Sequence, residues 1–285
     1  MPNKEYKFSR FLTGTKWIAK HFAITSKNLG KTRYYSVCLC LNPIIYTKHK
    51  MLLDNIAKAE NGDTNLALPV IREEELYSSS LELYIKKYDF PGTLSKYIHE
   101  YDTKLINLGD MFVVGPIGVG LDVDEGSLKG VHVCMAGGTG AYCFLDMVAY
   151  VLRYMVSEIN KRVDGLSNNF IDSSENFSDI SNSDFTLVYM TSFSNHDDGV
   201  YTDVCTQLQI LDEKYNLNKF KFINRFSDDT PKPPRWNQSF LNEQLGQYQG
   251  KISKVFLCGP TPFLDDSKEN LLKSGLVQQN QIKFV

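Results

Sequence analysis

The sequence predicts two domains, an N-terminal antiparallel Greek-key β-barrel and a C-terminal α/β domain with a Rossmann-like parallel sheet. Between residues 11 and 120, apolar residues come in short, strand-length runs separated by turn-rich stretches. From residue 131 onward, strand-like and helix-like segments alternate, which is typical of a parallel sheet with covering helices. The first of these strands stops at a glycine-rich turn. We therefore expect domains at residues 1–128 and 129–285.

The N-terminal half should contain several short strands and one helix. We expect strands at residues 17–25, 34–41, 81–88 and 111–114. Apolar residues recur at three and four positions between residues 48 and 60, which predicts a helix inserted at about residues 47–62. These apolar positions are Met51, Leu52, Ile56 and Ala59. We expect the inserted helix to lie on the barrel.

The C-terminal half should fold as alternating strands and helices. Strands are expected at residues 131–136, 185–191 and 220–224, and a last one at 254–258. Helices are expected at residues 142–160 and 202–215. Residues 167–183 are polar and acidic, with too few apolar side chains to offset their ordering entropy, so we interpret them as a surface loop.

Composition and charge exclude several function classes. The chain has 285 residues, of which 42% are hydrophobic, and a formal net charge of −2. This charge gives no electrostatic basis for binding nucleic acid or an anionic membrane surface. No apolar run approaches the roughly 20 residues that span a bilayer. We expect a cytoplasmic protein with a small-molecule or protein partner, and leave a mitochondrial or other organelle-associated assembly open.

The cysteines are expected to be reduced and without metal. Six cysteines are spread along the chain, and no secretory signal segment is recognisable. Cys38 and Cys40 have a spacing that puts both on one face of a strand, but no second pair or nearby histidine completes a ligand set. We therefore predict no metal site.

The glycine-rich turn at residues 137–140 is the first candidate binding site. Gly137, Gly138, Thr139 and Gly140 follow a buried strand and precede a helix. Such a turn directs main-chain N–H groups and a helix N-terminus toward an anion, commonly a phosphate. A plain tight turn has the same sequence pattern, so nucleotide binding needs support from elsewhere in the chain.

Two clusters in the N-terminal half add that support. Arg33 and Tyr35 share one face of a predicted strand, and Tyr34 and Ser36 share the other. Residues 84–88 contribute two tyrosines and two lysines, and residues 91–95 form a helix start with Ser or Thr as cap. A guanidinium, an aromatic face and a second helix N-terminus together suit a dinucleotide with a large planar ring.

The motifs also occur in an order that resembles a known family. They are Arg33-x-Tyr35-Ser36, Tyr84-Ile-Lys86-x-Tyr88, Gly92-x-x-Ser95-x-Tyr97, Gly109-Asp110, Gly115-Pro116-x-Gly118, Ala136-Gly-Gly-Thr-Gly140, Trp236 ahead of Phe240, and Cys258-Gly-Pro260. In order and approximate spacing the chain resembles the ferredoxin–NADP reductase superfamily, with the closest likeness to its NADH–cytochrome b5 reductase branch. The resemblance runs from about residue 11 to the C-terminus.

The resemblance implies an FAD site in the barrel. Arg33 would hold the pyrophosphate, Tyr35 would pack on the isoalloxazine, and Ser36 would hydrogen-bond near its reactive nitrogen. Further FAD contacts are implied for Lys86, Tyr88, Gly92, Thr93, Leu94, Ser95, Thr139 and the near-terminal Phe284.

The resemblance also implies a pyridine-nucleotide site in the second domain. Residues implied to contact NAD(P)H are Gly137, Gly138, Gly140, Cys258, Gly259 and Pro260. Ser36 and Cys258 would be the catalytic residues. The implied reaction is hydride transfer from NAD(P)H to FAD, followed by single-electron transfer to a haem protein such as cytochrome b5.

The chain departs from the family pattern in three places. The family usually has a hydrophobic residue and then Thr-Pro after the glycine turn, whereas this chain has Ala141, Tyr142 and Cys143. The family's first barrel strand is expected to be missing, because residues 1–11 do not supply it. The segment between residues 37 and 80 is much longer than the family's connection. These departures make NAD(P)H binding less secure than FAD binding and favour an associated protein.

Two interpretations therefore remain open. The first is an NADH-dependent flavoenzyme; NADH is favoured over NADPH because Asp197 and Asp198 follow the second strand and would repel a 2′-phosphate. The second is a reductase-fold subunit that acts as a structural or assembly component of a larger complex, with FAD bound or not and with little or no turnover.

Overall fold

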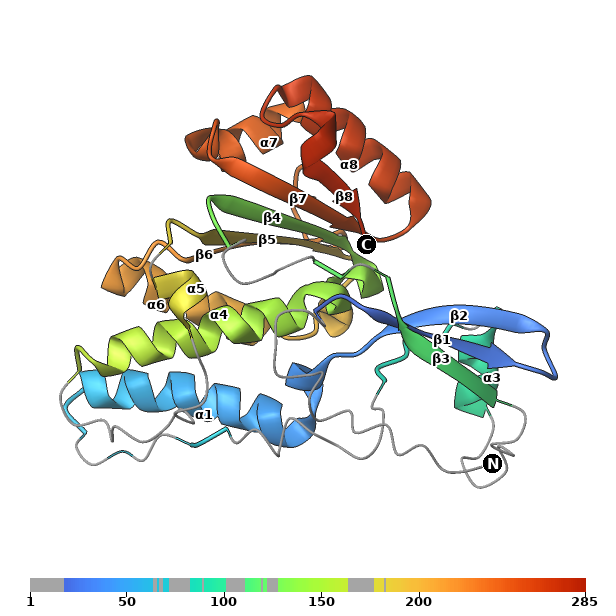
Figure 1. Cartoon of the computed structure of the whole chain (residues 1–285), viewed down its shortest axis with the longest axis horizontal. Helices are drawn as coiled ribbons and strands as arrows, with labels where there is room; N and C mark the ends of the chain where they lie inside the picture. Colours follow the sequence, from blue (N-terminus) through green and yellow to red (C-terminus); the bar gives the residue numbers. More distant parts are fainter. Residues whose placement is uncertain are drawn as a thin grey trace.

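The computed structural model describes residues 18–63, 66, 69–71, 83–88, 90–100, 111–118, 120–121, 128–163, 177–181 and 183–285. Figure 1 shows a small antiparallel sheet beside a larger parallel sheet that is covered by helices on both faces. This arrangement confirms the predicted succession of an antiparallel N-terminal unit and an α/β unit. The expected absence of a first barrel strand concerns residues 1–11, which lie outside the described residues.

The N-terminal sheet has three antiparallel strands in the order β2-β1-β3. They are β1 (His21–Ser26), β2 (Lys31–Ser36) and β3 (Met111–Ile117). Every second residue of β1 is buried, as expected for a strand with one face toward a core. A strand was expected at residues 81–88; of these, the described residues 83–88 contribute only an isolated bridge between Leu83 and Val37. The short helix α3 (Leu94–Glu100) lies beside β2.

The C-terminal sheet has five parallel strands in the order β6-β5-β4-β7-β8. They are β4 (Val131–Gly137), β5 (Thr186–Phe193), β6 (Phe220–Phe226), β7 (Ile252–Cys258) and β8 (Ile282–Phe284). All seven residues of β4 are buried, which explains why this strand appears in the sequence as a continuous apolar run. The prediction of β7 as the last strand was wrong, because β8 follows it. With only three residues, β8 leaves little periodicity to detect in the sequence.

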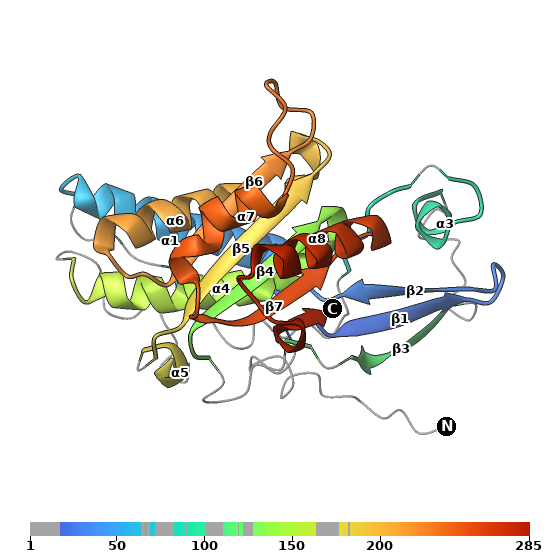
Figure 2. The ribbon, with the colours of Figure 1, turned by 90° about the horizontal axis from the view of Figure 1, so that it is seen from above.

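Helices cover both faces of this sheet (Figure 2). On one face lie α4 (Tyr142–Asn160) and α6 (Thr202–Tyr215), with the bounds that the sequence predicted; on the other lie α7 (Gln238–Leu245) and α8 (Thr261–Ser274). Each face has its own apolar core. The short helix α5 (Ser178–Ser181) falls within the segment expected as a loop. Among the described helices, none is both long and apolar enough to cross a membrane.

The inserted helix α1 (Pro43–Glu60) packs on the α/β unit, so the expectation that it lies on the barrel was wrong. It begins at Asn42, whose side chain accepts hydrogen bonds from Ile44 and Ile45, and Pro43 occupies its first position. Its buried residues join the core that α4 and α6 share with the sheet. Figure 1 shows α1 on the outer side of α4. Helical spacing in a sequence identifies the apolar face but not the partner that covers it.

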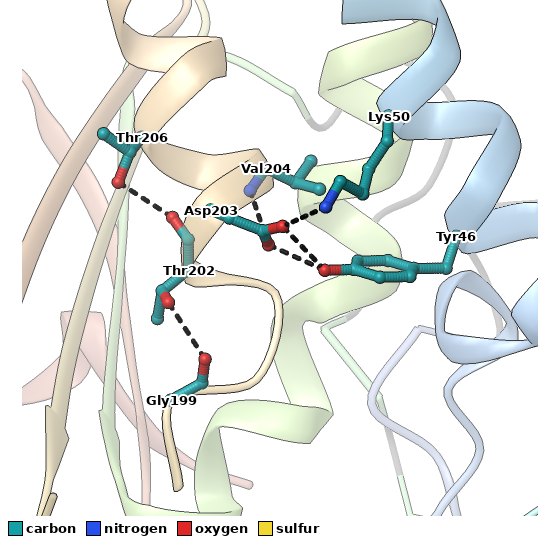
Figure 3. A network of polar contacts seen from close by, with 7 residues as sticks. All are labelled: Tyr46, Lys50, Gly199, Thr202, Asp203, Val204 and Thr206. Atoms are coloured by element: carbon teal, nitrogen blue, oxygen red, sulfur yellow. Dashed lines mark hydrogen bonds and ion pairs between the residues drawn. The ribbon is translucent and has the colours of Figure 1, made fainter. Parts of the chain in front are cut away.

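Polar contacts fix α1 to the first turn of α6 (Figure 3). The Tyr46 hydroxyl donates to the carboxylate of Asp203 at 2.8 Å, and the Lys50 ammonium lies 3.0 Å from the same carboxylate. Burial raises the pKa of Tyr46 to about 12, with a further contribution from the Asp203 hydrogen bond. For Asp203, burial alone would raise the pKa, but the hydrogen bonds from Tyr46 and Lys50 outweigh it and lower the pKa. At neutral pH the Tyr46 hydroxyl therefore keeps its proton and Asp203 stays ionised, so their hydrogen bond persists.

We expect Tyr46→Phe to lower the free energy of unfolding by about 1 kcal/mol, because it removes a hydrogen bond to a partly exposed carboxylate. Urea denaturation measures the change. Lys273→Met is the control, since it removes the exposed Lys273–Glu269 pair within α8 and should cost less than about 0.5 kcal/mol. Equal effects of the two substitutions would contradict a specific role of Tyr46 in docking α1.

Candidate functional site

The predicted glycine turn lies where β4 and β7 end side by side. β4 ends at Gly137, a 3-10 turn covers Gly138–Ala141, and α4 follows directly. The parallel register pairs Ala136 with Cys258, which is the last residue of β7. The two predicted nucleotide-binding motifs, residues 137–140 and 258–260, therefore meet at one edge of the sheet.

The glycines of this edge serve different purposes. A Cβ on Gly137 or on Gly259 would lie 2.9 Å from the ring of Phe263 in α8. A Cβ on Gly140 would overlap the main-chain carbonyl of Cys258. Gly138 differs, because it has a φ of +56° and a Cβ there would meet nothing within 4 Å. Packing explains three of these glycines, and the positive φ explains Gly138, which has open space where a Cβ would stand.

Across from this edge, a chain of polar contacts connects the two units. The Nδ1 atom of His21 in β1 lies 3.0 Å from the hydroxyl of Ser36 in β2. The Ser36 hydroxyl lies 3.0 Å from the sulfur of Cys143 in the first turn of α4, and the Cys143 sulfur lies 3.3 Å from that of Cys258. Ser36 and Cys258, the two residues predicted to be catalytic, are thus brought together by Cys143.

The direction of the hydrogen bonds determines which thiol ionises first. The hydrogen bond from Cys258 lowers the pKa of Cys143; burial opposes this shift, and the Ser36 hydroxyl adds to it. The hydrogen bond to Cys143 raises the pKa of Cys258, and burial raises it further. Burial also lowers the pKa of His21, so its imidazole is neutral. With a neutral His21 donating to Ser36, both Ser36 and Cys258 can donate to a Cys143 thiolate.

On the barrel side, the predicted flavin-binding residues form a loose group around β2. Arg33 is exposed, and its guanidinium donates to the carbonyl of Thr32 at 3.0 Å. Tyr35 is half-buried; burial raises its pKa, the charge of Arg33 lowers it and the nearby Tyr88 raises it. Tyr88 is 41% exposed. Among the described residues, no carboxylate pairs with Arg33, which leaves its charge available to an anion.

The predicted pyrophosphate-binding segment at residues 92–95 is tied to its neighbours by its own side chains. Lys31 donates to the carbonyl of Gly92 at 2.6 Å, and the Thr93 hydroxyl accepts from the N–H of Lys96. The hydroxyl of Ser95 donates to the carbonyl of Lys86 and accepts from the N–H of Tyr88, while Leu94 is buried. Ser95 therefore positions residues 86–88.

Lys86 contacts a segment that the sequence did not suggest. Its ammonium lies 2.7 Å from the carboxylate of Asp198, which ends the 3-10 turn His196–Asp198 after β5. Asp198 is one of the two carboxylates predicted to repel a 2′-phosphate. Because Lys86 neutralises Asp198, Asp197 is the one of the two carboxylates whose charge could still repel a 2′-phosphate.

Comparisons with known proteins identify the fold. No protein-family model and no curated protein matches the chain by sequence. Among solved structures, ferredoxin-NADP+ reductase from Plasmodium falciparum is 13% identical, with a TM-score of 0.52 over 94% of this chain and 82% of that one. The chain has the ferredoxin–NADP+ reductase fold. The predicted superfamily resemblance is therefore confirmed at the level of the fold.

Two further matches are to longer chains. The flavohemoglobin from Malassezia yamatoensis, solved with FAD and haem, is 13% identical, with a TM-score of 0.51 over 94% of this chain and 51% of that one. The CS-b5R domains of human Ncb5or are 16% identical, with a TM-score of 0.49 over 94% of this chain and 60% of that one. The chain thus spans less than two thirds of either protein.

Phe284 lies on the α8 side of the reductase fold. It pairs in register with Leu257, and its ring is 49% exposed, with the Lys268 ammonium 5.7 Å from its centre. Val285 points to the opposite face of the sheet and packs against the core that includes Cys143. Phe284 and Val285 thus point to opposite faces of the sheet, and the sequence alone does not show which of them is nearer the other unit.

Sequence reasoning missed His21 as a site residue and treated Cys143 only as a departure. The register of a hairpin could have revealed His21, because β1 and β2 place it directly opposite Ser36. No local signal reveals Cys143, which lies 107 residues from Ser36.

Metal ligands were not expected, and the described residues contain one group of suitable side chains. The Nε2 atom of His196 is hydrogen-bonded to the carboxylate of Asp229 at 2.7 Å, near Asp228, and all three residues are exposed or partly exposed. An ordinary surface hydrogen bond accounts for this arrangement.

We expect Gly140→Ala to lower the free energy of unfolding by about 3 kcal/mol, because the added methyl group meets main-chain atoms of Cys258 that cannot move independently. Gly246→Ala is the matched control. Gly246 has a φ of −57° and nothing within 4 Å of a Cβ, so the same substitution there should be neutral or slightly stabilising. Urea denaturation compares the two; wild-type stability of Gly140→Ala would mean that α4 and β7 can separate at no cost.

Proposed function

We propose that this chain is an FAD-dependent NAD(P)H oxidoreductase that passes electrons from NADH through FAD to a haem protein such as cytochrome b5. The observation that carries the proposal is the meeting of Ser36 and Cys258 through Cys143 at the boundary of the two units. These are the side chains expected beside the reacting rings of the two cofactors. Hydride transfer needs the rings in contact, and a site between two domains can provide that.

The residues around β2 fit a bound flavin. Bound FAD would accept a hydride and release electrons singly. The unpaired charge of Arg33 suits its pyrophosphate, and half-buried Tyr35, near Tyr88, offers an aromatic face. The backbone of residues 92–95 and the side chain of Lys86 complete the proposed cradle. Thr139 and Phe284 are further proposed FAD contacts.

The edge of the parallel sheet fits a pyridine nucleotide. Gly138 has open space above its backbone, and the start of α4 supplies a helix N-terminus for a phosphate. Gly137, Gly140, Gly259 and Pro260 would contact the nucleotide at the ends of β4 and β7, and Cys258 would lie against the nicotinamide ring. Tyr142, half-buried near Asp198 and Tyr88, would border the same site.

A second function is a reductase-fold subunit with an assembly role and little turnover. The observation in its favour is Cys143, whose sulfur already hydrogen-bonds both proposed catalytic residues. The long segment that contains α1 would then serve as a contact surface for other subunits. A cytoplasmic location, or an organelle-associated assembly, is compatible with either proposal.

Flavin uptake followed by reduction separates the two functions. We expect purified protein reconstituted with FAD to be yellow and to bleach when NADH is added without oxygen. Yellow protein that NADH leaves oxidised would support the assembly role, and a protein that takes up no FAD would exclude both the flavoenzyme and a flavin-bearing scaffold.

We expect Arg33→Ala to weaken FAD binding about 10- to 100-fold, because a hydrogen bond to a charged phosphate contributes about 1.5–3 kcal/mol. Arg162→Ala is the control, since Arg162 lies at the far end of α4 and donates to the carbonyl of Tyr215. Fluorescence titration of the apoprotein with FAD measures both. Equal affinities in the two variants would remove Arg33 from the proposed site.

We further propose that NADH is preferred over NADPH, with Asp197 as the residue that disfavours a 2′-phosphate. Asp197 is exposed at the turn after β5, and Lys86 does not neutralise it as it does Asp198. Asp197→Asn should raise kcat/KM for NADPH relative to NADH about fivefold, as expected from one screened charge. Asp265→Asn, at an exposed position of α8, should leave the ratio unchanged. A wild-type enzyme that prefers NADPH would overturn this proposal.

A further inference from the structure

Cys143 and Cys258 form a pair of thiols in hydrogen-bond contact, and hydride transfer as proposed above uses neither of them as a redox group. All six cysteines lie in the described part of the chain, and no other two of them are in hydrogen-bond contact. Cys143 is only 5% exposed, whereas Cys258 is the one cysteine of the six that is not buried. One thiol is therefore accessible from solvent and the other lies directly behind it.

The backbone holds the two sulfurs close together from two different elements. Cys143 is the second residue of α4, and Cys258 is the last residue of β7. The absence of a side chain at Gly140 lets the start of α4 approach the Cys258 carbonyl. The sulfurs lie 3.3 Å apart, and a disulfide needs about 2.05 Å, so closure requires a movement on the order of 1 Å.

We propose that Cys143 and Cys258 are a redox-active dithiol that reacts with low-molecular-weight disulfides by thiol–disulfide exchange. The proposal goes beyond the flavin chemistry and does not require a flavin. Cys258, the accessible thiol, forms the mixed disulfide, and Cys143 resolves it.

The exchange balances in two steps. The Cys258 sulfur attacks one sulfur of the substrate disulfide while its proton passes to the Cys143 thiolate; the substrate S–S bond breaks and one thiolate leaves. The Cys143 sulfur then attacks the Cys258 sulfur, the mixed disulfide breaks, and the second substrate thiol leaves with the Cys143 proton. Two cysteines lose two electrons and the substrate disulfide gains them. A dithiol reductant reverses both steps.

The surroundings of Cys143 favour its part in this exchange. Hydrogen bonds from Cys258 and Ser36 stabilise a thiolate at Cys143 and lower its pKa, so the two sulfurs, 3.3 Å apart, share one proton. Cys258 is the nucleophile while that proton lies on Cys143. Its place in the first turn of α4 adds the favourable field of a helix N-terminus. The nearby Cys38 and Cys134 stay neutral thiols, because burial raises the pKa of each.

The test uses the reduced full-length apoprotein with oxidised glutathione as the probe. We expect wild type to lose the mass of two hydrogens and to give a linked Cys143–Cys258 peptide on non-reducing peptide mapping. Dithiothreitol should restore both thiols. Because flavin is absent, failure of the proposed flavoenzyme function leaves this result unaffected.

Serine substitutions separate the two thiols. Cys143→Ser should stop at a stable glutathione adduct on Cys258, and Cys258→Ser should give neither adduct nor internal disulfide. Cys205→Ser, at a buried cysteine in α6, should behave as wild type. Wild type that does not react, keeps its adduct, or links other cysteines would overturn the proposal. If a variant does not fold, wild type alone carries the test. Samples of its reaction with oxidised glutathione, alkylated at successive times, must show the glutathione adduct on Cys258 before the internal disulfide. The reverse order would overturn the proposal.

Discussion

The first turn of α4 approaches the end of β7 so closely that residue 140 has no space for a side chain. Most other features of the proposed site depend on this contact. It brings Cys143 beside Cys258, and Cys143 in turn reaches Ser36 on the antiparallel sheet. Adjacent contacts hold the same junction, since Cys38 donates to the carbonyl of Tyr142 and the N–H groups of Leu39 and Cys40 donate to Asp146. The segment after β2 is thereby fixed to the first two turns of α4.

The same fixation explains why α1 belongs to the α/β unit although it is inserted within the N-terminal half of the sequence. The segment that precedes α1 is already held against α4, so the helix that follows has the outer face of α4 and α6 within reach. The Nδ1 atom of buried His49 lies 2.6 Å from the hydroxyl of Tyr201. The carboxylate of Glu60 accepts a hydrogen bond from the Tyr215 hydroxyl and pairs with the Lys214 ammonium. These contacts run the whole length of α1, so its position is determined at both ends.

How much could be predicted from the sequence depended on how locally each feature is encoded. The helices α4 and α6 have the predicted bounds. Strand β4 was predicted from its apolar run, because a strand that is buried on both faces has apolar side chains at consecutive positions. Strand β8 is too short for a periodic signal, and the partner of α1 is not encoded in its own spacing. The glycines were ambiguous for a physical reason: a glycine that admits the Phe263 ring and one that faces a phosphate have the same sequence signature.

The oxidation state of the thiol pair would determine what the Ser36 hydroxyl can do. A hydroxyl donates one hydrogen bond; while His21 donates to it, that hydrogen can go to a Cys143 thiolate. In a disulfide the Cys143 sulfur carries no charge and is a weak acceptor, and closure draws it toward Cys258. The Ser36 hydroxyl would then turn to another acceptor, and the flavin proposed above would be one. The two redox centres would therefore compete for one proton donor, which couples them without any contact between disulfide and flavin.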